Sequence, residues 1–222
     1  MNSVFRWVLD LLYPPKCMLC GRILEDSREA LCGRCGYNLP EYEVAPRQVP
    51  YFTRSAAPFF YEPPIRDAIL RFKFQGREAY AAQFGRWMAV SVRDKLDGTY
   101  DLISWVPCGK RRKRKRGYDQ AELLAKALAK ELGTEAVRTL EKTRDNKAQS
   151  RTTGAAQRRA NVVGVYRAYK PERFSGKRVL LVDDVLTTGS TLSECGKTLK
   201  LAGSGDLVCA VLAVTRQDHE KP

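Results

Sequence analysis

Hydrophobic residues in this 222-residue chain form short apolar runs that alternate with longer amphipathic stretches. Apolar runs bounded by polar or turn residues predict buried strands, whereas apolar residues spaced three and four apart predict helices. The expected strands are residues 55–61, 101–106, 136–141, 161–166, 179–182 and 207–214. The expected helices are residues 63–74, 77–96, 119–132 and 191–201. Strands that alternate with helices predict an α/β fold, a parallel sheet with helices on both faces.

Local signals mark the ends of these helices. Asp119 precedes the helical spacing and Glu122 follows three positions later, which is the arrangement of a capping box. Gly133 ends the same stretch, and Pro63 opens the first helix. Residues 142–159 are mostly polar, and we expect a long loop there.

The most informative stretch is residues 179–191, where four apolar residues precede two acids and a loop of hydroxyl residues and glycine. Asp183 and Asp184 would lie at the carboxyl end of a buried strand, where open α/β sheets bind ligands. The next residues offer hydroxyls and backbone N–H groups beside a helix N-terminus, which suits a phosphate: Thr187, Thr188, Gly189, Ser190 and Thr191. The alternative is a generic strand and turn, but adjacent carboxylates repel unless a cation joins them.

This order of residues resembles the 13-residue binding motif of type I phosphoribosyltransferases, which hold phosphoribosyl pyrophosphate (PRPP) with Mg2+. The resemblance implies that Asp183 and Asp184 serve the ribose hydroxyls, directly or through metal-bound water. It also implies that residues 187–191 wrap the 5′-phosphate. We therefore expect a type I phosphoribosyltransferase-like sheet, with PRPP and Mg2+ as ligands.

Charge adds a second expectation. The chain has 39 basic and 25 acidic residues, a net charge of +14. Residues 110–170 alone hold 18 Lys/Arg and six Asp/Glu and so supply +12 of it. A field this concentrated indicates a polyanionic partner, either pyrophosphate, nucleic acid or both.

Four of the seven cysteines form two CxxC-Gly pairs separated by eleven residues: Cys17, Cys20, Cys32 and Cys35. Two such turns complete a tetrahedral all-thiolate site, which suits structural Zn2+. A thioredoxin-like redox motif and accidental pairing are the alternatives, and two pairs so close together disfavour both. Free thiols of this kind fit a reducing, cytoplasmic environment better than a disulfide framework.

The first 13 residues are apolar but too short to span a bilayer. They lack a basic start and a small-residue cleavage site, so a signal peptide is not expected. Their helical spacing predicts an amphipathic helix that docks on the domain, and we expect no stable membrane insertion. Residues 1–50 are therefore assigned to this helix, the zinc module and a proline-framed linker, and residues 51–222 to the phosphoribosyltransferase-like domain.

In type I phosphoribosyltransferases the loop after the first central strand binds pyrophosphate, and the resemblance places that loop here at residues 107–120. The implied contacts are Cys108, Gly109, Lys110, Arg116 and Gly117. Seven consecutive basic residues exceed what one pyrophosphate requires, so a nucleic-acid backbone is also expected along them: Lys110, Arg111, Arg112, Lys113, Arg114, Lys115 and Arg116. A solvated run of charge is the alternative.

Residues 142–159 occupy the place of the flexible hairpin that closes over PRPP in this fold. Closure would exclude water while an oxocarbenium-like ribosyl centre forms, and a cation would neutralise the departing pyrophosphate. Arg144, Lys147 and Arg151 are the catalytic candidates. A mobile basic contact for single strands remains an open alternative for the same loop.

With these parts located, the whole chain resembles the ComF family, cytoplasmic competence-associated proteins also called amidophosphoribosyltransferase-like. Besides the cysteines and the PRPP motif, the shared pieces are Leu12-Tyr13-Pro14-Pro15, Phe72-Lys73-Phe74-Gln75-Gly76, residues 116–125, Gln149 and Arg159-Ala160-Asn161-Val162. The resemblance implies a role in DNA uptake for natural transformation, with single-stranded DNA and PRPP as partners and other competence proteins as further partners.

Two further features bear on catalysis. After Phe174 the chain has no aromatic residue to stack a nucleobase, which argues against an ordinary salvage enzyme. The one histidine, His219, lies in a polar tail and is a poor catalytic candidate. Three hypotheses remain: a DNA-uptake factor with PRPP as ligand, an active phosphoribosyltransferase with an unidentified acceptor, and a non-catalytic docking protein of the uptake machinery.

Overall fold

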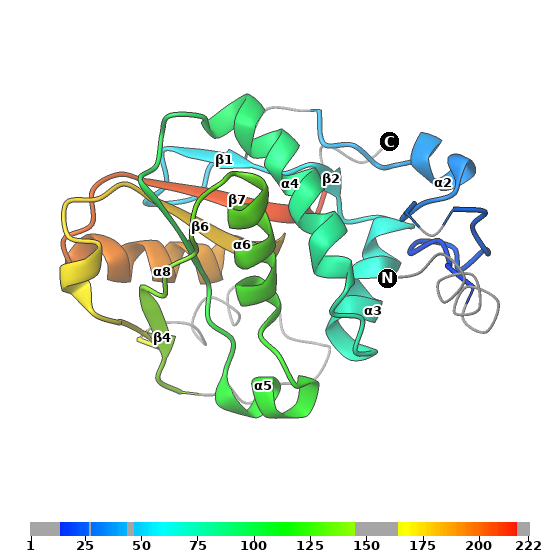
Figure 1. Cartoon of the computed structure of the whole chain (residues 1–222). Helices are drawn as coiled ribbons and strands as arrows, with labels where there is room; N and C mark the ends of the chain where they lie inside the picture. The colour runs from blue at the N-terminus through cyan, green and yellow to red at the C-terminus, as the bar shows by residue number, and fades with distance from the viewer. Residues whose placement is uncertain (1–13, 27, 44–46, 145–163, 217–222) are drawn as a thin grey trace.

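A computed structural model describes residues 14–26, 28–43, 47–144 and 164–216 (Figure 1). Its centre is a parallel sheet with strand order β1-β7-β6-β3, in which β2 also pairs with β7. The strands are β1 (Arg54–Ala56), β2 (Phe59–Phe60), β3 (Leu102–Trp105), β6 (Val179–Leu186) and β7 (Leu207–Val214). The parallel sheet expected from the alternation of strands and helices is confirmed.

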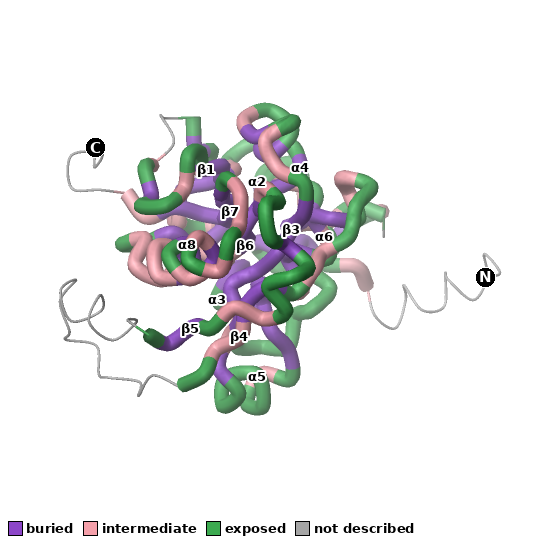
Figure 2. The backbone as a smooth tube through the Cα atoms, turned by 90° about the vertical axis from the view of Figure 1, so that its left-hand side faces the viewer, coloured by how far each residue is buried: buried purple, intermediate pink, exposed green. Residues whose placement is uncertain are grey.

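Helices cover both faces of this sheet. One face carries α4 (Tyr80–Leu96) and α6 (Gln120–Glu131), and the other carries α8 (Ser190–Leu201), as the side view in Figure 2 shows. Helix α3 (Ile65–Phe74) packs into the same core as α4 and α6. None of the helices in the described part of the chain has the length and apolar character needed to cross a membrane.

The first half of strand β6 shows why its sequence is continuously apolar. Leu180 and Val182 pack into the core beneath α3, α4 and α6, whereas Val179 and Leu181 pack into the core beneath α8. Successive side chains of a strand point to opposite faces, so a strand covered on both sides needs apolar residues at every position. All eight residues of β7 are buried for the same reason.

Smaller elements surround the sheet. Helix α2 (Gly33–Tyr37) belongs to the cysteine region, and α5 (Lys110–Arg116) follows β3. Strands β4 (Leu140–Lys142) and β5 (Tyr166–Ala168) form an antiparallel pair, followed by the 3-10 turn η1 (Pro171–Arg173).

The basic run is a helix, and the prediction of a loop there was wrong. Gly117 ends α5 in a left-handed conformation (φ +87°) and donates its N–H to the carbonyl of Lys113, a common helix stop. Lysine and arginine are good helix formers, although their mutual repulsion disfavours an isolated helix. The flanking glycines and the docking of Arg116 therefore decide the conformation.

Several strand boundaries also differ from expectation. Residues 55–61 form two strands rather than one, because Pro58 between them has no N–H for the ladder. The strand expected at 136–141 is reduced to β4 and an isolated bridge between Ala136 and Ile103. Of the strand expected at 161–166 only Tyr166 lies in β5, and residues 161–163 are outside the described part of the chain.

The stretch expected to be a linker is packed onto the sheet where the structure describes it. Tyr42 and Val49 are buried, and the Tyr42 N–H donates to the carbonyl of Pro58 at 2.8 Å. Glu41 bridges to Phe59 beside β2. The helix expected in residues 1–13 lies outside the described residues.

Gly85 gives a test of how closely α4 and α6 approach. A Cβ at this position would stand 2.7 Å from the Cβ of Ala127 and 2.8 Å from its carbonyl carbon. We expect Gly85→Ala to lower the free energy of unfolding by about 1–3 kcal/mol in urea denaturation, because the helices must separate. Gly36→Ala in α2 is the matched control, since no atom lies within 4 Å of its added Cβ. Equal stability of the two variants would contradict this packing.

Candidate functional site

Asp183 and Asp184 lie in the second half of β6, beside the end of β3 and the segments that follow both strands. Strand β6 is longer than expected because its pairing with β7 continues to Leu186. The acids therefore belong to the strand itself and do not follow it. This places both carboxyl groups on a rigid element at the carboxyl edge of the sheet, where such folds bind ligands.

Lys73 supplies the cation that the two adjacent acids require. Its Nζ lies 2.8 Å from Oδ1 of Asp184, and each of the two side chains is only 17% exposed. Asp183 accepts the backbone N–H of Asp184 at 2.8 Å. Burial and the neighbouring Asp184 carboxylate raise the pKa of Asp183 to about 8, and Lys73 opposes that shift. The pair thus lies in a confined site that favours added positive charge.

The threonine–glycine turn after β6 joins the acids to α8. Gly189 has φ +74° at the N-cap of α8, a left-handed conformation that favours glycine. The Thr188 and Ser190 hydroxyls are 2.8 Å apart. The first N–H groups of a helix have no acceptor within the helix, so this end presents donors as well as hydroxyls. The predicted phosphate residues are therefore brought together in one turn.

Arg47 holds this turn from outside the motif. Its guanidinium donates to the carbonyl oxygen of Thr187 and, at 2.7 Å, to that of Thr215 at the end of β7. Val49 lies under Gly189, 3.7 Å from where a Cβ would be. The segment before β1 thus supports the phosphate-binding turn, a role that the sequence interpretation missed.

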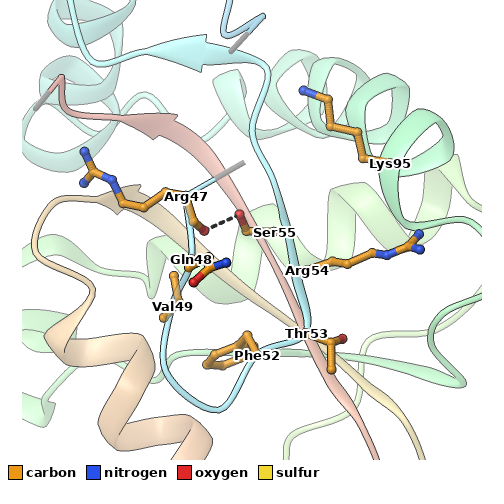
Figure 3. A pocket seen from close by; sticks show the side chains of 8 residues that line it. All are labelled: Arg47, Gln48, Val49, Phe52, Thr53, Arg54, Ser55 and Lys95. Atoms are coloured by element: carbon orange, nitrogen blue, oxygen red, sulfur yellow. Dashed lines mark hydrogen bonds between the residues drawn. The ribbon is translucent and has the colours of Figure 1, made fainter. Parts of the chain in front are cut away.

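A pocket of about 380 Å3 opens beside this segment (Figure 3). None of the predicted site residues that the structure describes lines it. The side chain of Arg47 points away from those of Arg54 and Lys95, so the three cations do not converge on a common point. We therefore assign no ligand to this pocket.

The segment after β3 is organised by Asp119. One carboxylate oxygen accepts the backbone N–H of Cys108 at 2.7 Å, and the other caps α6 through the N–H of Glu122 at 3.4 Å. The predicted N-cap is confirmed, and it also fixes the start of the expected pyrophosphate loop. Burial, followed by the charge of Asp119, raises the pKa of the Cys108 thiol to about 12, so this sulfur stays protonated at neutral pH.

Within α5 one basic residue differs from the other six. Arg116 is half-buried, hydrogen-bonds Gln120, and lies with its Cζ 4.8 Å from the centre of the Phe74 ring. Burial lowers the pKa of Arg116, and the charge of Asp184 opposes that shift, so this guanidinium shares the electrostatic environment of the acids. The other six side chains of α5 are exposed: Lys110, Arg111, Arg112, Lys113, Arg114 and Lys115.

The expected closing loop is described only at its start. Arg144 is exposed just beyond β4. Lys147 and Arg151 lie outside the described residues, so their place relative to the acids stays a prediction.

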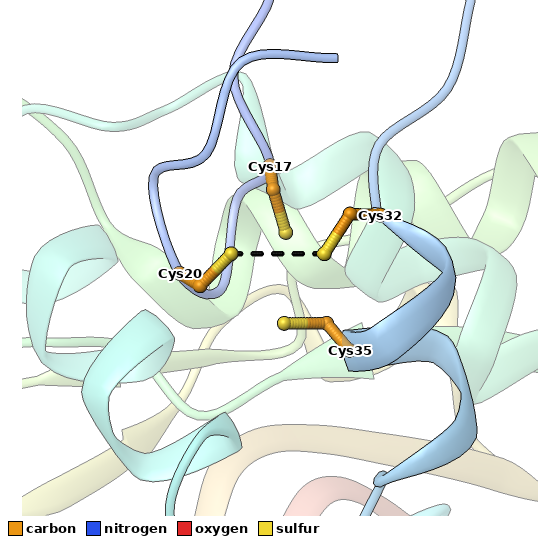
Figure 4. A group of neighbouring side chains, drawn as sticks. All are labelled: Cys17, Cys20, Cys32 and Cys35. Carbon is orange, nitrogen blue, oxygen red and sulfur yellow. Dashed lines mark hydrogen bonds between the residues drawn. The ribbon is translucent and has the colours of Figure 1, made fainter.

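The four predicted zinc ligands form one cluster (Figure 4), with their sulfur atoms within 4.8 Å of one another. Zinc bound to four thiolates at about 2.3 Å places neighbouring sulfurs roughly 3.8 Å apart. The Cys20 and Cys32 sulfurs are 3.7 Å apart, too far for a disulfide and suited to a shared metal. Burial alone would raise the pKa of the Cys17 thiol, but the backbone N–H groups of Cys20 and Cys32 outweigh it and lower that pKa to about 6. These residues fit structural Zn2+.

Three consecutive residues at the end of α3 join the metal cluster to the acids. Arg71 donates to the carbonyl oxygens of Met18 at 2.9 Å and Leu19 at 2.7 Å, within the first cysteine turn. The carbonyl of Phe72 accepts the Tyr118 hydroxyl, and Lys73 pairs with Asp184. The sequence interpretation quoted Lys73 in a motif without assigning it a role. No local signal in the sequence indicates this pairing, because Asp184 lies 111 residues further along the chain.

Lys73→Met tests the ion pair. We expect the variant to lose about 1–3 kcal/mol of unfolding free energy, because Asp184 would remain confined beside Asp183 without its cation. Mg2+ should restore more of the melting temperature in this variant than in the wild type. The double variant Lys73→Met/Asp184→Asn should be more stable than the sum of the single losses predicts. Strict additivity in that cycle would show that the two residues do not interact.

Residues 119–222 match the family model of the phosphoribosyl transferase domain, and residues 8–47 match that of the double zinc ribbon domain. The chain is 33% identical over 182 residues to competence protein F of Haemophilus influenzae, covering 78% of this chain and 79% of that protein. It is 30% identical over 198 residues to DNA utilization protein YhgH of Salmonella typhi, covering 85% of each.

Among solved structures, glutamine PRPP amidotransferase from B. subtilis is 21% identical, with a TM-score of 0.42 over 60% of this chain and 26% of that one. The match to the phosphoribosyl transferase domain and the observed parallel sheet establish the type I phosphoribosyltransferase fold.

Proposed function

Since the chain belongs to the ComF family of competence proteins, we propose that it acts in DNA uptake during natural transformation. In that role it binds PRPP with Mg2+ at the acids of β6, and single-stranded DNA along α5. One observation carries the PRPP proposal: the two acids, their lysine partner and the threonine–glycine turn meet at the carboxyl end of one strand.

The residues present suit PRPP and Mg2+. Carboxylate oxygens are preferred Mg2+ ligands, and Asp183 and Asp184 would hold the ion or the ribose hydroxyls. When bound, Mg2+ neutralises part of the pyrophosphate charge. Residues 187–191 would bind the 5′-phosphate through hydroxyls and the N-terminus of α8. Lys73 and Arg116 add fixed positive charge beside the acids.

Pyrophosphate contacts remain part of the proposal. The proposed set is Cys108, Gly109, Lys110, Arg116 and Gly117, and the charge of Asp184 acts on the pKa of Arg116. Since the Cys108 N–H is already donated to Asp119, we expect Arg116 to contribute more than Cys108. Arg144, Lys147 and Arg151 are proposed to approach once ligand is bound.

Single-stranded DNA is proposed for α5 because six of its cations are exposed and only Arg116 is half-buried, against the Phe74 ring. Lys113 shares Glu122 with Lys126, and α5 itself contains seven basic residues and no acidic one. Such a surface attracts a phosphate backbone through counterion release. The four thiolates favour a reducing compartment such as the cytoplasm.

Calorimetric titration of PRPP in the presence of Mg2+ tests the proposal, repeated with a thymidine oligonucleotide present. We expect saturable PRPP binding that disappears without Mg2+, and oligonucleotide binding that weakens steeply with salt. No PRPP binding in either condition would refute the ligand assignment. Release of pyrophosphate with an added acceptor would extend the proposal to phosphoribosyl transfer. Absence of both ligands would favour a docking role among other competence proteins.

A further inference from the structure

A second basic surface lies where the cysteine module meets α3 and α4. It is a pocket of about 530 Å3. Its lining comes from both sides of this junction: Pro14, Lys16, Cys17, Met18, Cys20, Gly21, Arg71, Arg77 and Tyr80. None of these residues belongs to the PRPP motif or to α5.

The charge of this pocket is positive. Lys16, Arg71 and Arg77 line it, and none of the acidic residues in the described ranges does. Lys16 and Arg77 are exposed, and neither forms an ion pair within the described part of the chain. Four thiolates around a zinc ion would place two negative charges nearby, and a single cation cannot offset both. The three cations together leave the pocket able to attract an anion.

Arg71 is held in place before any ligand arrives. One of its terminal nitrogens donates to the carbonyls of Met18 and Leu19, and no described residue accepts from its Nε or Nη1. A guanidinium fixed in this way loses little conformational freedom when it binds a phosphate. The same two hydrogen bonds tie the first cysteine turn to α3, so the pocket depends on the folded module.

Aromatic rings lie in and beside the pocket. Tyr80 lines it and packs edge-on against Phe84, with ring centres 6.0 Å apart. Phe74, 64% exposed, lies three residues before Arg77 and contacts Arg116 at the end of α5. In Figure 1 the end of α3 lies between α5 and the cysteine region. Arg116 of α5 and Phe74 at the end of α3, followed along the chain by the lining residues Arg77 and Tyr80, define the path between α5 and the pocket.

We propose that this pocket binds a phosphate of single-stranded DNA, with bases stacking on Phe74 and Tyr80 as the strand continues toward α5. The inference rests on the proposed DNA-binding function and adds a second contact region to it. Exposed rings favour a single strand over a duplex, because duplex bases are already stacked on one another. A cationic groove with interspersed rings is the usual arrangement for sequence-tolerant binding of single strands.

Fluorescence anisotropy with a labelled 30-nucleotide thymidine oligomer tests the pocket. Lys16→Ala/Arg77→Ala should weaken binding about 10-fold and reduce the slope of log K against log salt by about 1.4, since each phosphate contact on a single strand contributes about 0.7. Arg173→Ala/Lys177→Ala removes the same charge from exposed positions around η1, at the other end of the molecule (Figure 1), and should leave that slope nearly unchanged.

Equal effects of the two double variants would overturn the inference, because they would reflect net charge alone. Loss of zinc from Lys16→Ala/Arg77→Ala with unchanged DNA affinity would also overturn it, since the cations would then serve the metal. If the wild type does not bind the oligomer, the proposed function itself fails. If an α5 variant weakens binding and the pocket variant does not, only the pocket assignment fails.

Phe74 gives a second measurement that does not depend on charge. Phe74→Leu should weaken oligomer binding about 5- to 20-fold, while Phe74→Trp should retain it, because stacking requires a ring. The side chain is largely exposed, so both variants should melt near the wild-type temperature. Equal affinities of the leucine and tryptophan variants would remove Phe74 from the path.

Discussion

Asp183→Asn/Asp184→Asn is expected to lower the affinity for PRPP in the presence of Mg2+ by at least about 100-fold. Each lost charge-assisted contact is worth about 1.5–3 kcal/mol, and every 1.4 kcal/mol is a factor of ten in affinity. Asparagine keeps the shape of the side chain and removes the repulsion between the two acids. The variant should therefore remain folded, with Lys73 retaining a hydrogen-bond acceptor at position 184.

Calorimetry measures this effect, and Asp94→Asn/Asp97→Asn near the end of α4 is the control with the same change in charge at exposed positions. Affinity within threefold of the wild type in the β6 variant would show that PRPP binds elsewhere or that the acids do not contact it. Thermal melting of both variants separates loss of ligand from loss of fold.

Removal of the metal is expected to have the largest effect on stability. Cys35→Ser should lower the zinc content from one ion per chain to none and the free energy of unfolding by about 4–5 kcal/mol, the range reached when a structural metal is lost. For a chain of this size that corresponds to a decrease of roughly 8–20 °C in melting temperature. Cys17, Met18, Leu19, Leu24 and Cys35 all pack in the core shared with α3, α4 and α6.

Cys108→Ser makes the same chemical change outside the cluster, and it should keep one zinc ion per chain. The zinc content and the melting temperature of the two variants test whether the four cysteines hold a structural metal. A Cys35→Ser protein that retains zinc, or that melts with the wild type, would contradict a structural four-cysteine site.

The cysteine site and the acid pair were predictable because their signals are local. Two CxxC pairs specify a metal cluster by spacing alone, and the acids follow an apolar run that a buried strand requires. Lys73 was not predictable as their partner, since it lies 111 residues away and reaches Asp184 only through the packing of α3 on the sheet. Arg47 is similarly remote from Thr187, 140 residues along the chain.

The helical form of the basic run was missed for a different reason. Seven adjacent like charges disfavour an isolated helix, so local propensity and repulsion give opposite expectations. Gly117 and the contact of Arg116 with Phe74 settle the outcome, and the latter is tertiary. Helicity spreads the charges around a cylinder, so only part of the run can face one ligand. This separates Arg116 from its exposed neighbours.

The last turn of α3 has a practical consequence for anyone who wishes to cut the chain. Arg71 donates hydrogen bonds to the cysteine module, the Phe72 carbonyl accepts one from Tyr118, and Lys73 forms an ion pair with Asp184. These three residues are consecutive. A fragment that lacks residues 1–50 would lose the carbonyl groups that accept hydrogen bonds from Arg71. It would also lose Arg47, which holds the phosphate-binding turn, and would expose the apolar surface that the cysteine module covers. Such a fragment would be a poor surrogate for the intact protein in ligand assays or screening.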